Sequence, residues 1–331
     1  MRYRRNDAKA YARERLQGIW AATLTPFDAD LSLDERGWRA NVRHWYRELG
    51  IRGLFVNGKQ GEFASMTLAE RKRAAEIAVE EARSCPGGER SVMVSCSDQS
   101  VDAVVDLARH AEAIGAEYVV VHTPLLYFGA HTADTLFEYY RHVASQVEIG
   151  VALWNQPPDC GYALEPEVCL RIAELPNVVA IKYSVERERY ARLSRMAQGR
   201  LIVSTSSEEH WLDNIVELGW RLYLCSTPPF LLQSADDRRM HEYTELAFRG
   251  ETEKARKIRD SLDPVRKALR DTRPPGKAAA HQKYWQELLG QAGGRVRRPL
   301  LELTEKEKAA TRAAFESCGL KCESASSALA R

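Results

Sequence analysis

A lysine stands at the end of a short apolar run, Val178-Val179-Ala180-Ile181-Lys182. A nearly unbroken run of apolar and β-branched residues is typical of a parallel strand that is buried on both faces. Enclosing a charged lysine there costs free energy. Partial desolvation lowers the pKa of the amine, so that it can attack a carbonyl carbon. The alternative is a lysine whose ammonium group extends to water at the strand end.

The composition limits the class of protein. The chain has 331 residues, of which 44% are hydrophobic and 28% charged, enough for a large core. The formal net charge of +2 gives no reason to expect a nucleic-acid partner. Residues 1–16 lack the apolar segment of a secretory signal, and no apolar run approaches the length of a membrane helix. The seven cysteines are scattered without a C-x-x-C pair, so we expect reduced thiols, no metal site and a cytoplasmic location.

Strand and helix patterns alternate along most of the chain. Short apolar runs predict strands at residues 18–27, 53–57, 91–96, 118–123, 149–154, 178–182, 201–204 and 222–225. Helical spacing lies between them, at residues 100–114, 132–146, 166–175, 186–196 and 208–218. Ser32 with Glu35, and Thr67 with Glu70, predict capping boxes at the start of two further helices. Eight such units predict an α/β fold, a (β/α)8 TIM barrel with additional C-terminal helices. No G-x-G-x-x-G follows the first strand, which argues against a dinucleotide-binding fold.

The same patterns divide the chain into four segments. We expect an N-terminal helical extension at residues 1–17, the barrel at 18–235, a C-terminal helical region at 236–320 and a flexible tail at 321–331. Helices in the third segment are expected at 236–271, 278–290 and 304–318, with a break at Arg273–Gly276.

Active sites in (β/α)8 barrels lie at the carboxyl ends of the strands. The residues at those ends are Thr23, Thr25, Gly58 to Glu62, Pro124 to Tyr127, Trp154, Asn155, Lys182, Ser206, Ser207 and Ser226. Lys182 is thus expected in a mouth lined by small polar groups, backbone amides and an aromatic ring, which favours the imine-forming interpretation. Tyr183, the next residue on a regular strand, faces the other way and is interpreted as packing.

Several short motifs occur in a characteristic order. They are T-P-F at Thr25–Phe27, G-x-x-G-E at Gly58–Glu62, S-x-T-x-x-E at Ser65–Glu70, N-x-P at Asn155–Pro157, Ile181-Lys182, Gly250 with Ala255-Arg256, and Arg298–Leu300 with Gly319. In order and spacing they resemble the dihydrodipicolinate synthase / N-acetylneuraminate lyase superfamily of class I, pyruvate-type aldolases, almost from end to end. The resemblance implies that Lys182 forms the imine. It also implies that backbone amides of Gly58–Gly61 hold the carboxylate of a 2-oxo acid.

The resemblance implies a Schiff-base-forming lyase of the aldolase or hydratase-aldolase type. Its substrate would be a small 2-oxo acid such as pyruvate or a pyruvate adduct, because a protonated imine withdraws electrons from the adjacent carbon. No metal or cofactor is required, and a dimer or tetramer of identical chains is expected. Two alternatives are a 2-oxo-3-deoxy acid dehydratase and a catalytically altered or inactive relative that binds a small carboxylic acid. A third is decarboxylation of a 3-oxo acid through the same imine.

The chain departs from the family pattern at several positions. Trp154 stands where the family has a proton-relaying tyrosine, and an indole N–H cannot act as a general acid or base near neutral pH. Leu126, next to Tyr127, replaces a second tyrosine of dihydrodipicolinate synthases. Asp159 aligns with the arginine that receives their distal carboxylate. These changes predict that the chain is not a standard dihydrodipicolinate synthase.

Some candidate residues have two interpretations. Lys59 and Gln60 replace two threonines of the glycine-rich turn. Lys59 is either a second cation that lowers the pKa of Lys182, pairs with substrate or acts as the base, or a turn lysine that points outward. Trp154 is either a stacking wall for a planar substrate or bulk that fills the space of the tyrosine.

The remaining candidates are assigned by their residue types. Gly58, Gln60, Gly61, Asn155, Tyr127, Ser206, Ser207 and Ser226 are candidate substrate-binding residues, and Lys182, Lys59 and Trp154 are candidate catalytic residues. Glu62 is interpreted as a structural carboxylate at a helix end. His122 and His210 lack a carboxylate or cysteine at ligand spacing, so they are interpreted as ordinary polar residues.

Overall fold

The computed structural model describes residues 2–86, 90–124, 130–205 and 208–321. By their contacts, the residues form two compact units. The first unit consists of Met1–Trp20, Gly53–Val56 and Ser91–Ser226. The second consists of Ala21–Arg52, Asn57–Arg90 and Thr227–Arg331.

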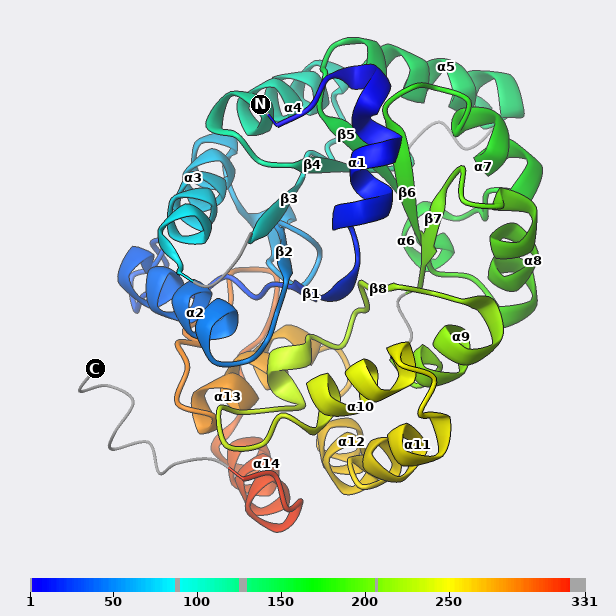
Figure 1. Ribbon diagram of the computed structural model, residues 1–331. Helices are drawn as coiled ribbons and strands as arrows, with labels where there is room; N and C mark the ends of the chain where they lie inside the picture. Colours follow the sequence, from blue (N-terminus) through cyan, green and yellow to red (C-terminus); the bar gives the residue numbers. More distant parts are fainter. Residues whose placement is uncertain (1, 87–89, 125–129, 206–207, 322–331) are drawn as a thin grey trace. The chain divides into compact units, whose positions relative to one another are not determined.

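Eight parallel strands form one sheet in the part of the chain that the structure describes. They are β1 (Gly18–Ala22), β2 (Gly53–Val56), β3 (Ser91–Ser95), β4 (Tyr118–His122), β5 (Gly150–Asn155), β6 (Val178–Tyr183), β7 (Ile202–Ser204) and β8 (Leu222–Tyr223). Hydrogen bonds join them in the order β7-β6-β5-β4-β3-β2-β1-β8, and β7 also contacts β8, so the strands form a ring (Figure 1). The predicted fold class, a (β/α)8 barrel with additional C-terminal helices, is confirmed.

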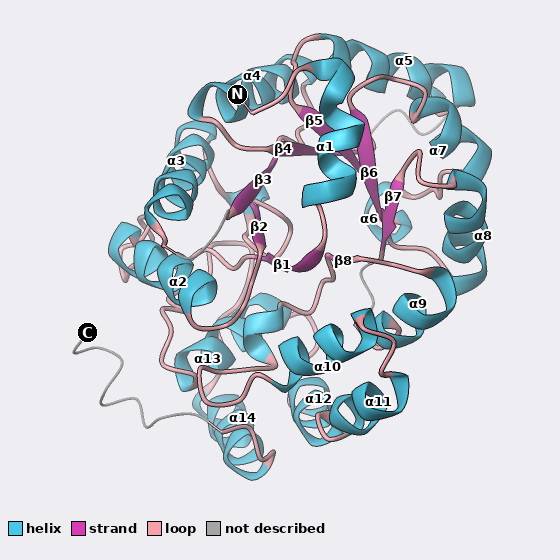
Figure 2. Cartoon of the chain, viewed as in Figure 1, coloured by secondary structure: helices cyan, strands magenta, loops and turns pink. Residues whose placement is uncertain are grey.

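Helices alternate with the strands along the chain (Figure 2). The first unit contains η1 (Arg5–Asp7), α1 (Ala8–Arg15), α4 (Val101–Ile114), α5 (Ala133–Ser145), α6 (Pro157–Cys160), α7 (Pro166–Ile172), α8 (Arg187–Ala197) and α9 (Trp211–Leu218). Of these, α4, α5, α7, α8 and α9 lie outside the ring of strands. The second unit contains α2 (Glu35–Arg47), η2 (Phe63–Ser65), α3 (Leu68–Ser84), η4 (Pro229–Leu231), α10 (Arg239–Phe248), α11 (Thr252–Asp260), α12 (Asp263–Asp271), α13 (Ala278–Leu288) and α14 (Glu305–Ser317).

Two predicted helix starts have different outcomes. The capping box of Thr67 and Glu70 is confirmed at the start of α3. The predicted box of Ser32 and Glu35 is wrong, because α2 begins only at Glu35. Its cap is Asp34, whose carboxylate accepts a hydrogen bond from the Gly37 N–H. An aspartate is at least as good a cap as a serine, and here it lies next to the first helical residue.

Two predicted segment lengths are also corrected. The first strand ends at Ala22 instead of residue 27, and Phe27 forms an isolated antiparallel bridge with Leu33. Pro26, which has no N–H to donate, favours that early end. The single helix expected at 236–271 is three helices, α10 to α12. The first of them is followed by Gly250 at φ +79°, a left-handed conformation that stops a helix.

The amino-terminal end of the barrel is filled by the N-terminal extension. Tyr3 stacks on Tyr11 with ring centroids 4.4 Å apart, and both lie within 6.4 Å of the ring of Tyr118 at the start of β4. The Tyr3 hydroxyl accepts a hydrogen bond of 2.8 Å from the N–H of Gly150, the first residue of β5. Helix α1, dark blue in Figure 1, contacts β5 and β6. A site in this barrel is therefore expected at the opposite end, where the strands finish.

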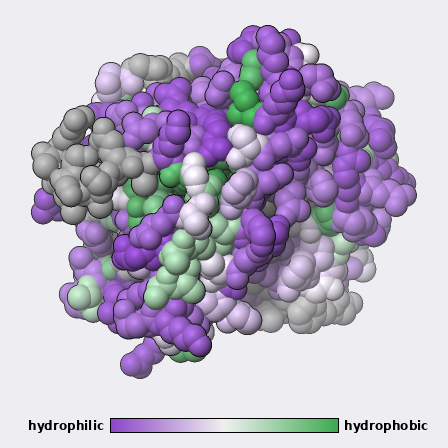
Figure 3. Space-filling view, turned by 90° about the horizontal axis from the view of Figure 1, so that it is seen from below, coloured by the Kyte–Doolittle hydropathy of each residue, from purple (hydrophilic) through white to green (hydrophobic). Residues whose placement is uncertain are grey.

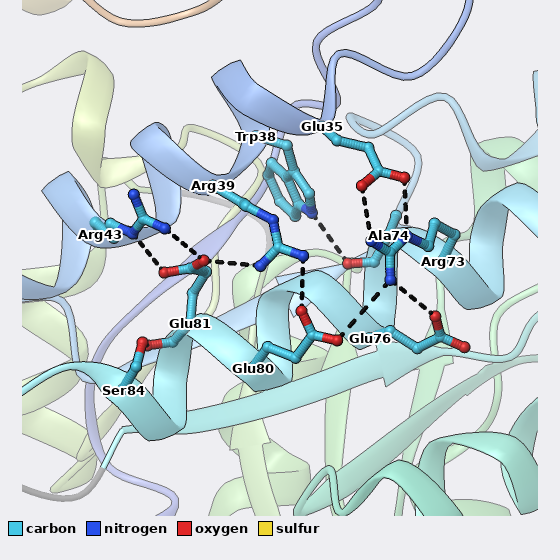
Figure 4. A network of polar contacts seen from close by, with 10 residues as sticks. All are labelled: Glu35, Trp38, Arg39, Arg43, Arg73, Ala74, Glu76, Glu80, Glu81 and Ser84. Carbon is cyan, nitrogen blue, oxygen red and sulfur yellow. Dashed lines mark hydrogen bonds and ion pairs between the residues drawn. The ribbon is translucent and has the colours of Figure 1, made fainter.

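Helices α2 and α3 pack against each other in the second unit (Figure 4). The indole N–H of Trp38 donates a hydrogen bond of 3.0 Å to the Ala74 carbonyl. The buried Glu81 carboxylate accepts hydrogen bonds from Arg39 at 2.8 Å and from Arg43 at 2.5 Å. Burial raises the pKa of Glu81, but the two arginines outweigh it, so the pKa of this carboxyl lies below its ordinary value.

Hydrophilic residues cover most of the face shown in Figure 3, and no described helix has the length and apolar character to span a membrane. The six cysteines that the structure describes are buried and form no disulfide. Cys96, next to β3, and Cys225, near the end of β8, are both buried.

Candidate active site

Four side chains at the carboxyl ends of neighbouring strands lie in one line. The sheet register pairs His122 of β4 with Trp154 of β5, Trp154 with Lys182 of β6, and Lys182 with Ser204 of β7. Because side chains alternate between the two faces of a strand, residues paired in this way share one face. This face is the barrel interior, since the Lys182 amine approaches Phe55 of β2, a strand that is not a neighbour of β6.

Lys182 is enclosed by aromatic rings. Lys182 is 1% exposed, and its Nζ lies 5.4 Å from the ring centroid of Phe55 and 5.5 Å from that of Trp154. The two rings meet edge to face, with centroids 5.6 Å apart. Burial disfavours a charged ammonium group, whereas the aromatic faces attract one. The alternative of a lysine that extends to water is wrong, because the amine lies inside the barrel.

His122 is the residue of this line that sequence reasoning treated as an ordinary polar residue. It is 6% exposed, and its imidazole meets the Trp154 ring edge to face at a centroid distance of 4.6 Å. Its Nδ1 lies 2.7 Å from the Thr123 carbonyl oxygen, and its backbone N–H donates a hydrogen bond of 2.9 Å to Ser97 Oγ. The ring is therefore fixed on the same interior face as Lys182.

Ser204 was also missed, because the prediction placed the hydroxyls of strand 7 at residues 206 and 207. It is 1% exposed, and its hydroxyl has no hydrogen-bond partner among the residues that the structure describes. The alternation of side chains along the strand was not a sufficient signal, because only the register, which pairs Ser204 with Lys182, places Ser204 on the same face.

The residues next to this line face the other way. Tyr183 is buried, and its hydroxyl donates to the Leu164 carbonyl, so its interpretation as packing is confirmed. Asn155 is also buried; its amide donates to Thr123 Oγ1 at 3.2 Å, and its carbonyl oxygen accepts from the Leu164 N–H at 3.0 Å. Through these contacts, the Asn155 side chain holds the segment that follows β5. Its predicted contact with substrate stays a prediction.

The glycine-rich turn belongs to the second unit. The Gly61 N–H donates a hydrogen bond of 3.0 Å to the Gly58 carbonyl, so this amide closes the turn. A Cβ on Gly61 would lie 3.0 Å from Thr25 Oγ1 and 3.2 Å from the Thr23 carbonyl oxygen, closer than most Cβ contacts. A side chain at position 61 would therefore require Thr25 and the backbone at Thr23 to shift by a few tenths of an ångström.

The two replacements inside that turn differ in exposure. Lys59 is exposed, and Gln60 is partly buried. The exposure of Lys59 agrees with the interpretation as a turn lysine that points outward.

A buried ion pair holds the end of the turn. Glu62 is 4% exposed; one carboxylate oxygen lies 2.5 Å from Lys283 Nζ, and the other accepts a hydrogen bond of 2.9 Å from the Arg297 N–H. Burial lowers the pKa of Lys283, while Glu62 acts in the opposite direction. The guanidinium of Arg297 also binds both oxygens of Glu70, at 2.6 and 2.9 Å, which lowers the pKa of Glu70 to about 2. These contacts agree with a structural role for Glu62.

The other candidates are placed as follows. Tyr127, Ser206 and Ser207 lie outside the described residues, as does Leu126. Ser226 follows β8 and is partly buried, and His210 is the residue before α9. Within the described ranges, no group of histidine, cysteine and carboxylate side chains is arranged to hold a metal ion.

Comparisons with known proteins match almost the whole chain. Residues 15–317 match the model of the dihydrodipicolinate synthetase family. The 4-hydroxy-tetrahydrodipicolinate synthase of Methanopyrus kandleri is 30% identical over 312 residues, 92% of this chain and 97% of the relative. The synthase of the same name from Methylobacterium radiotolerans is 29% identical over 306 residues, with the same shares. YagE, a prophage protein of Escherichia coli K12 whose structure was solved with pyruvate, superposes with a TM-score of 0.81 at 22% identity, over 92% of this chain and 99% of its own. The resemblance seen in the motifs is thus confirmed, and the chain belongs to the dihydrodipicolinate synthetase family of class I aldolase-type lyases.

Proposed function

We propose that Lys182 forms an imine with a 2-oxo acid such as pyruvate, and that the chain is a lyase of the aldolase or hydratase-aldolase type. The observation that carries this proposal is the position of the Lys182 amine, buried inside the barrel at the carboxyl end of β6 between Phe55 and Trp154. Burial favours the uncharged amine, which is the nucleophilic form. The pyruvate bound to a family member of the same fold supports the choice of ligand.

The chemistry follows from the imine. The amine adds to the C2 carbonyl and water leaves, which gives an iminium that attracts electrons from C3. In an aldol cleavage, a base takes the proton of the C4 hydroxyl, the C3–C4 bond breaks, its electron pair forms an enamine, and C4 leaves as an aldehyde. In a dehydration, a proton leaves C3 and hydroxide leaves C4. The same barrel can therefore support an aldolase, a hydratase-aldolase or a 2-oxo-3-deoxy acid dehydratase.

We further propose that the substrate is not that of the synthases after which the two relatives are named. Trp154 replaces the proton-relaying tyrosine, and Asp159 stands in the first turn of α6 in place of the arginine that receives a second carboxylate. A carboxylate at that position repels a second substrate carboxylate instead of binding it. We expect no 4-hydroxy-tetrahydrodipicolinate synthase activity from the purified protein, and activity at a rate of about 10 per second, typical of enzymes, would refute this part.

The imine is tested by reduction with sodium borohydride. Incubation with pyruvate should give one covalent adduct by mass spectrometry, and peptide mapping should locate it at Lys182. Lys182→Ala should give no adduct. The buried Lys283 provides an internal control, since its ion pair with Glu62 should keep it unmodified. Failure to trap an adduct with pyruvate and with a panel of longer 2-oxo acids would refute the proposal.

A second candidate function is supported by Trp154 alone. Without the tyrosine, the barrel would bind a small carboxylic acid and not turn it over. Trp154→Tyr distinguishes the two. If the variant gains turnover while the affinity for the acid stays unchanged, the natural protein lacks only the proton relay and is a binding protein.

Two further points from the resemblance stay predictions. The amides of the Gly58–Gly61 turn are proposed to hold the substrate carboxylate, with the Gly61 N–H closing the turn through the Gly58 carbonyl. Gly61→Ala should disturb the turn and raise the pyruvate concentration needed for half-maximal trapping. A dimer or tetramer of identical chains is proposed as well. Size-exclusion chromatography with light scattering measures the molar mass directly, and a mass near 37.4 kDa, that of a single chain, would refute it.

A further inference from the structure

The chemistry at Lys182 needs a group that moves protons, and Trp154 cannot supply one. Exchange between iminium and enamine requires a base that takes a proton from C3 and later returns it. The family places a tyrosine at position 154, whereas this chain has an indole, which only donates hydrogen bonds. The need for such a group rests on the proposed function, because it assumes that Lys182 forms an imine.

Other groups near Lys182 are poor bases near neutral pH. Ser204 carries a hydroxyl, which loses its proton only at high pH unless a neighbouring base activates it. Burial raises the pKa of the Cys225 thiol well above its ordinary range. The charge of Lys182 acts in the opposite direction but does not outweigh burial. Histidine is the side chain whose ordinary pKa lies near neutrality. His122 is therefore the member of the interior line that is suited to the task.

The position of His122 agrees with this task. It is paired with Trp154 in the sheet register, and Trp154 with Lys182, so two strand spacings of about 4.8 Å separate the backbones of His122 and Lys182. Both side chains rise from the same interior face. Trp154 contacts both of them, because its ring centroid lies 5.5 Å from Lys182 Nζ and 4.6 Å from the centroid of the His122 ring.

The contacts of His122 also determine which ring nitrogen carries the proton. A carbonyl oxygen only accepts hydrogen bonds, so the contact of 2.7 Å with the Thr123 carbonyl requires a proton on Nδ1. In the neutral ring, Nε2 then carries the lone pair, as in other histidines that act as bases. The contact of Nδ1 with the Thr123 carbonyl and the edge-to-face contact with Trp154 hold the ring in this orientation.

We propose that His122 Nε2 is the catalytic base and acid of this site, which takes the proton from C3 of a 2-oxo acid bound to Lys182 and returns it. In the forward step, the C3–H bond breaks, its electron pair forms the C2–C3 double bond of the enamine, and the proton moves to Nε2. In the reverse step, the imidazolium returns a proton to C3 and the iminium forms again. No oxidant, reductant or metal takes part.

The test measures exchange of the pyruvate methyl protons in D2O by proton NMR, together with borohydride trapping of the same samples. His122→Asn is the informative variant, because its amide nitrogen can still donate to the Thr123 carbonyl while Nε2 is lost. We expect trapping within about twofold of the natural protein and an exchange rate at least about 100-fold lower, the usual range for losing a general base. His122→Gln should behave in the same way.

Several controls make the outcomes distinct. His142→Asn, which changes an exposed histidine of α5, should leave exchange unchanged. Free imidazole should partly restore exchange to His122→Ala, because it replaces the missing ring. Circular dichroism and the melting temperature establish that each variant is folded.

The results separate this inference from the proposed function. Absence of trapping in the natural protein refutes the imine itself. Trapping with no exchange in the natural protein, or unchanged exchange in folded His122→Asn, overturns the assignment of His122 and leaves the imine intact. Loss of both trapping and exchange in His122→Asn, with a native circular dichroism spectrum, also overturns it, since His122 would then be needed for binding.

Discussion

Removing Lys283 should destabilise the protein strongly, because the Glu62 carboxylate would remain buried without its cation. At the observed separation of 2.5 Å, two unit charges attract each other by about 7 kcal/mol at an effective dielectric constant of about 20. The cost of taking both charges out of water offsets much of this attraction. Breaking such a buried pair from one side typically costs about 3–5 kcal/mol. Lys283→Met should therefore lower the free energy of unfolding by about that amount.

Urea titration followed by tryptophan fluorescence measures this change, and thermal melting gives a second value. For a chain of this length, an unfolding entropy of about 2 cal/mol/K per residue converts the loss to a melting temperature lower by about 5–8 °C. Lys267→Met is the matched control, since Lys267 pairs with Asp271 at an exposed i,i+4 position of α12. Its cost should stay below about 0.5 kcal/mol.

The double variant Glu62→Gln/Lys283→Met tests whether the pair is the cause. Removing both charges leaves no unpaired ion, so the double variant should be no less stable than Lys283→Met alone. The coupling energy of this cycle should exceed about 2 kcal/mol. A cost for Lys283→Met as small as that of Lys267→Met, or costs that simply add in the double variant, would refute the reasoning.

Three other substitutions give further predictions. Trp154→Phe should keep pyruvate trapping and methyl-proton exchange within about threefold, because the indole N–H transfers no proton; both assays already described measure this. Lys59→Ala should change the pyruvate concentration for half-maximal trapping by less than about twofold, because Lys59 is exposed; a tenfold rise would instead indicate a second cation in the site. The pKa of Glu70 is lowered to about 2 by Arg297, so its contribution to stability is present above pH 4.5 and is lost as the pH falls toward 2. Glu70→Gln should therefore lower the urea midpoint at pH 7 and make little difference near pH 2, and an equal difference at both values would contradict this origin.

The alternation of strands and helices was predictable because each element carries its own periodic signal. The run Val178–Lys182 indicates a buried strand, and the structure has β6 at Val178–Tyr183. The opposite orientations of Lys182 and Tyr183 follow from the two-residue period of a strand. The exact start of α2 was harder to predict, because Ser32 and Asp34 both suit a helix cap. The position of Asp34 next to the first helical residue decided between them.

The interior line of the site was only partly predictable. Lys182 and Trp154 were identified because each ends an apolar run. His122 and Ser204 share their face only through the pairing of one strand with the next, and this register includes a shift between β5 and β6 at Val151 and Ala152. One sequence does not contain that register. The ion pair of Glu62 with Lys283 joins residues more than 200 positions apart, so no local pattern indicates it.

The most direct test of the central claim is quantitative peptide mapping after borohydride reduction with isotopically labelled pyruvate. The account predicts label on the peptide that contains Lys182, in proportion to the fraction of protein trapped, and none on the peptides that contain Lys59 or Lys283. Label distributed over exposed lysines, or a folded protein that carries no label at Lys182 with any 2-oxo acid, would contradict it.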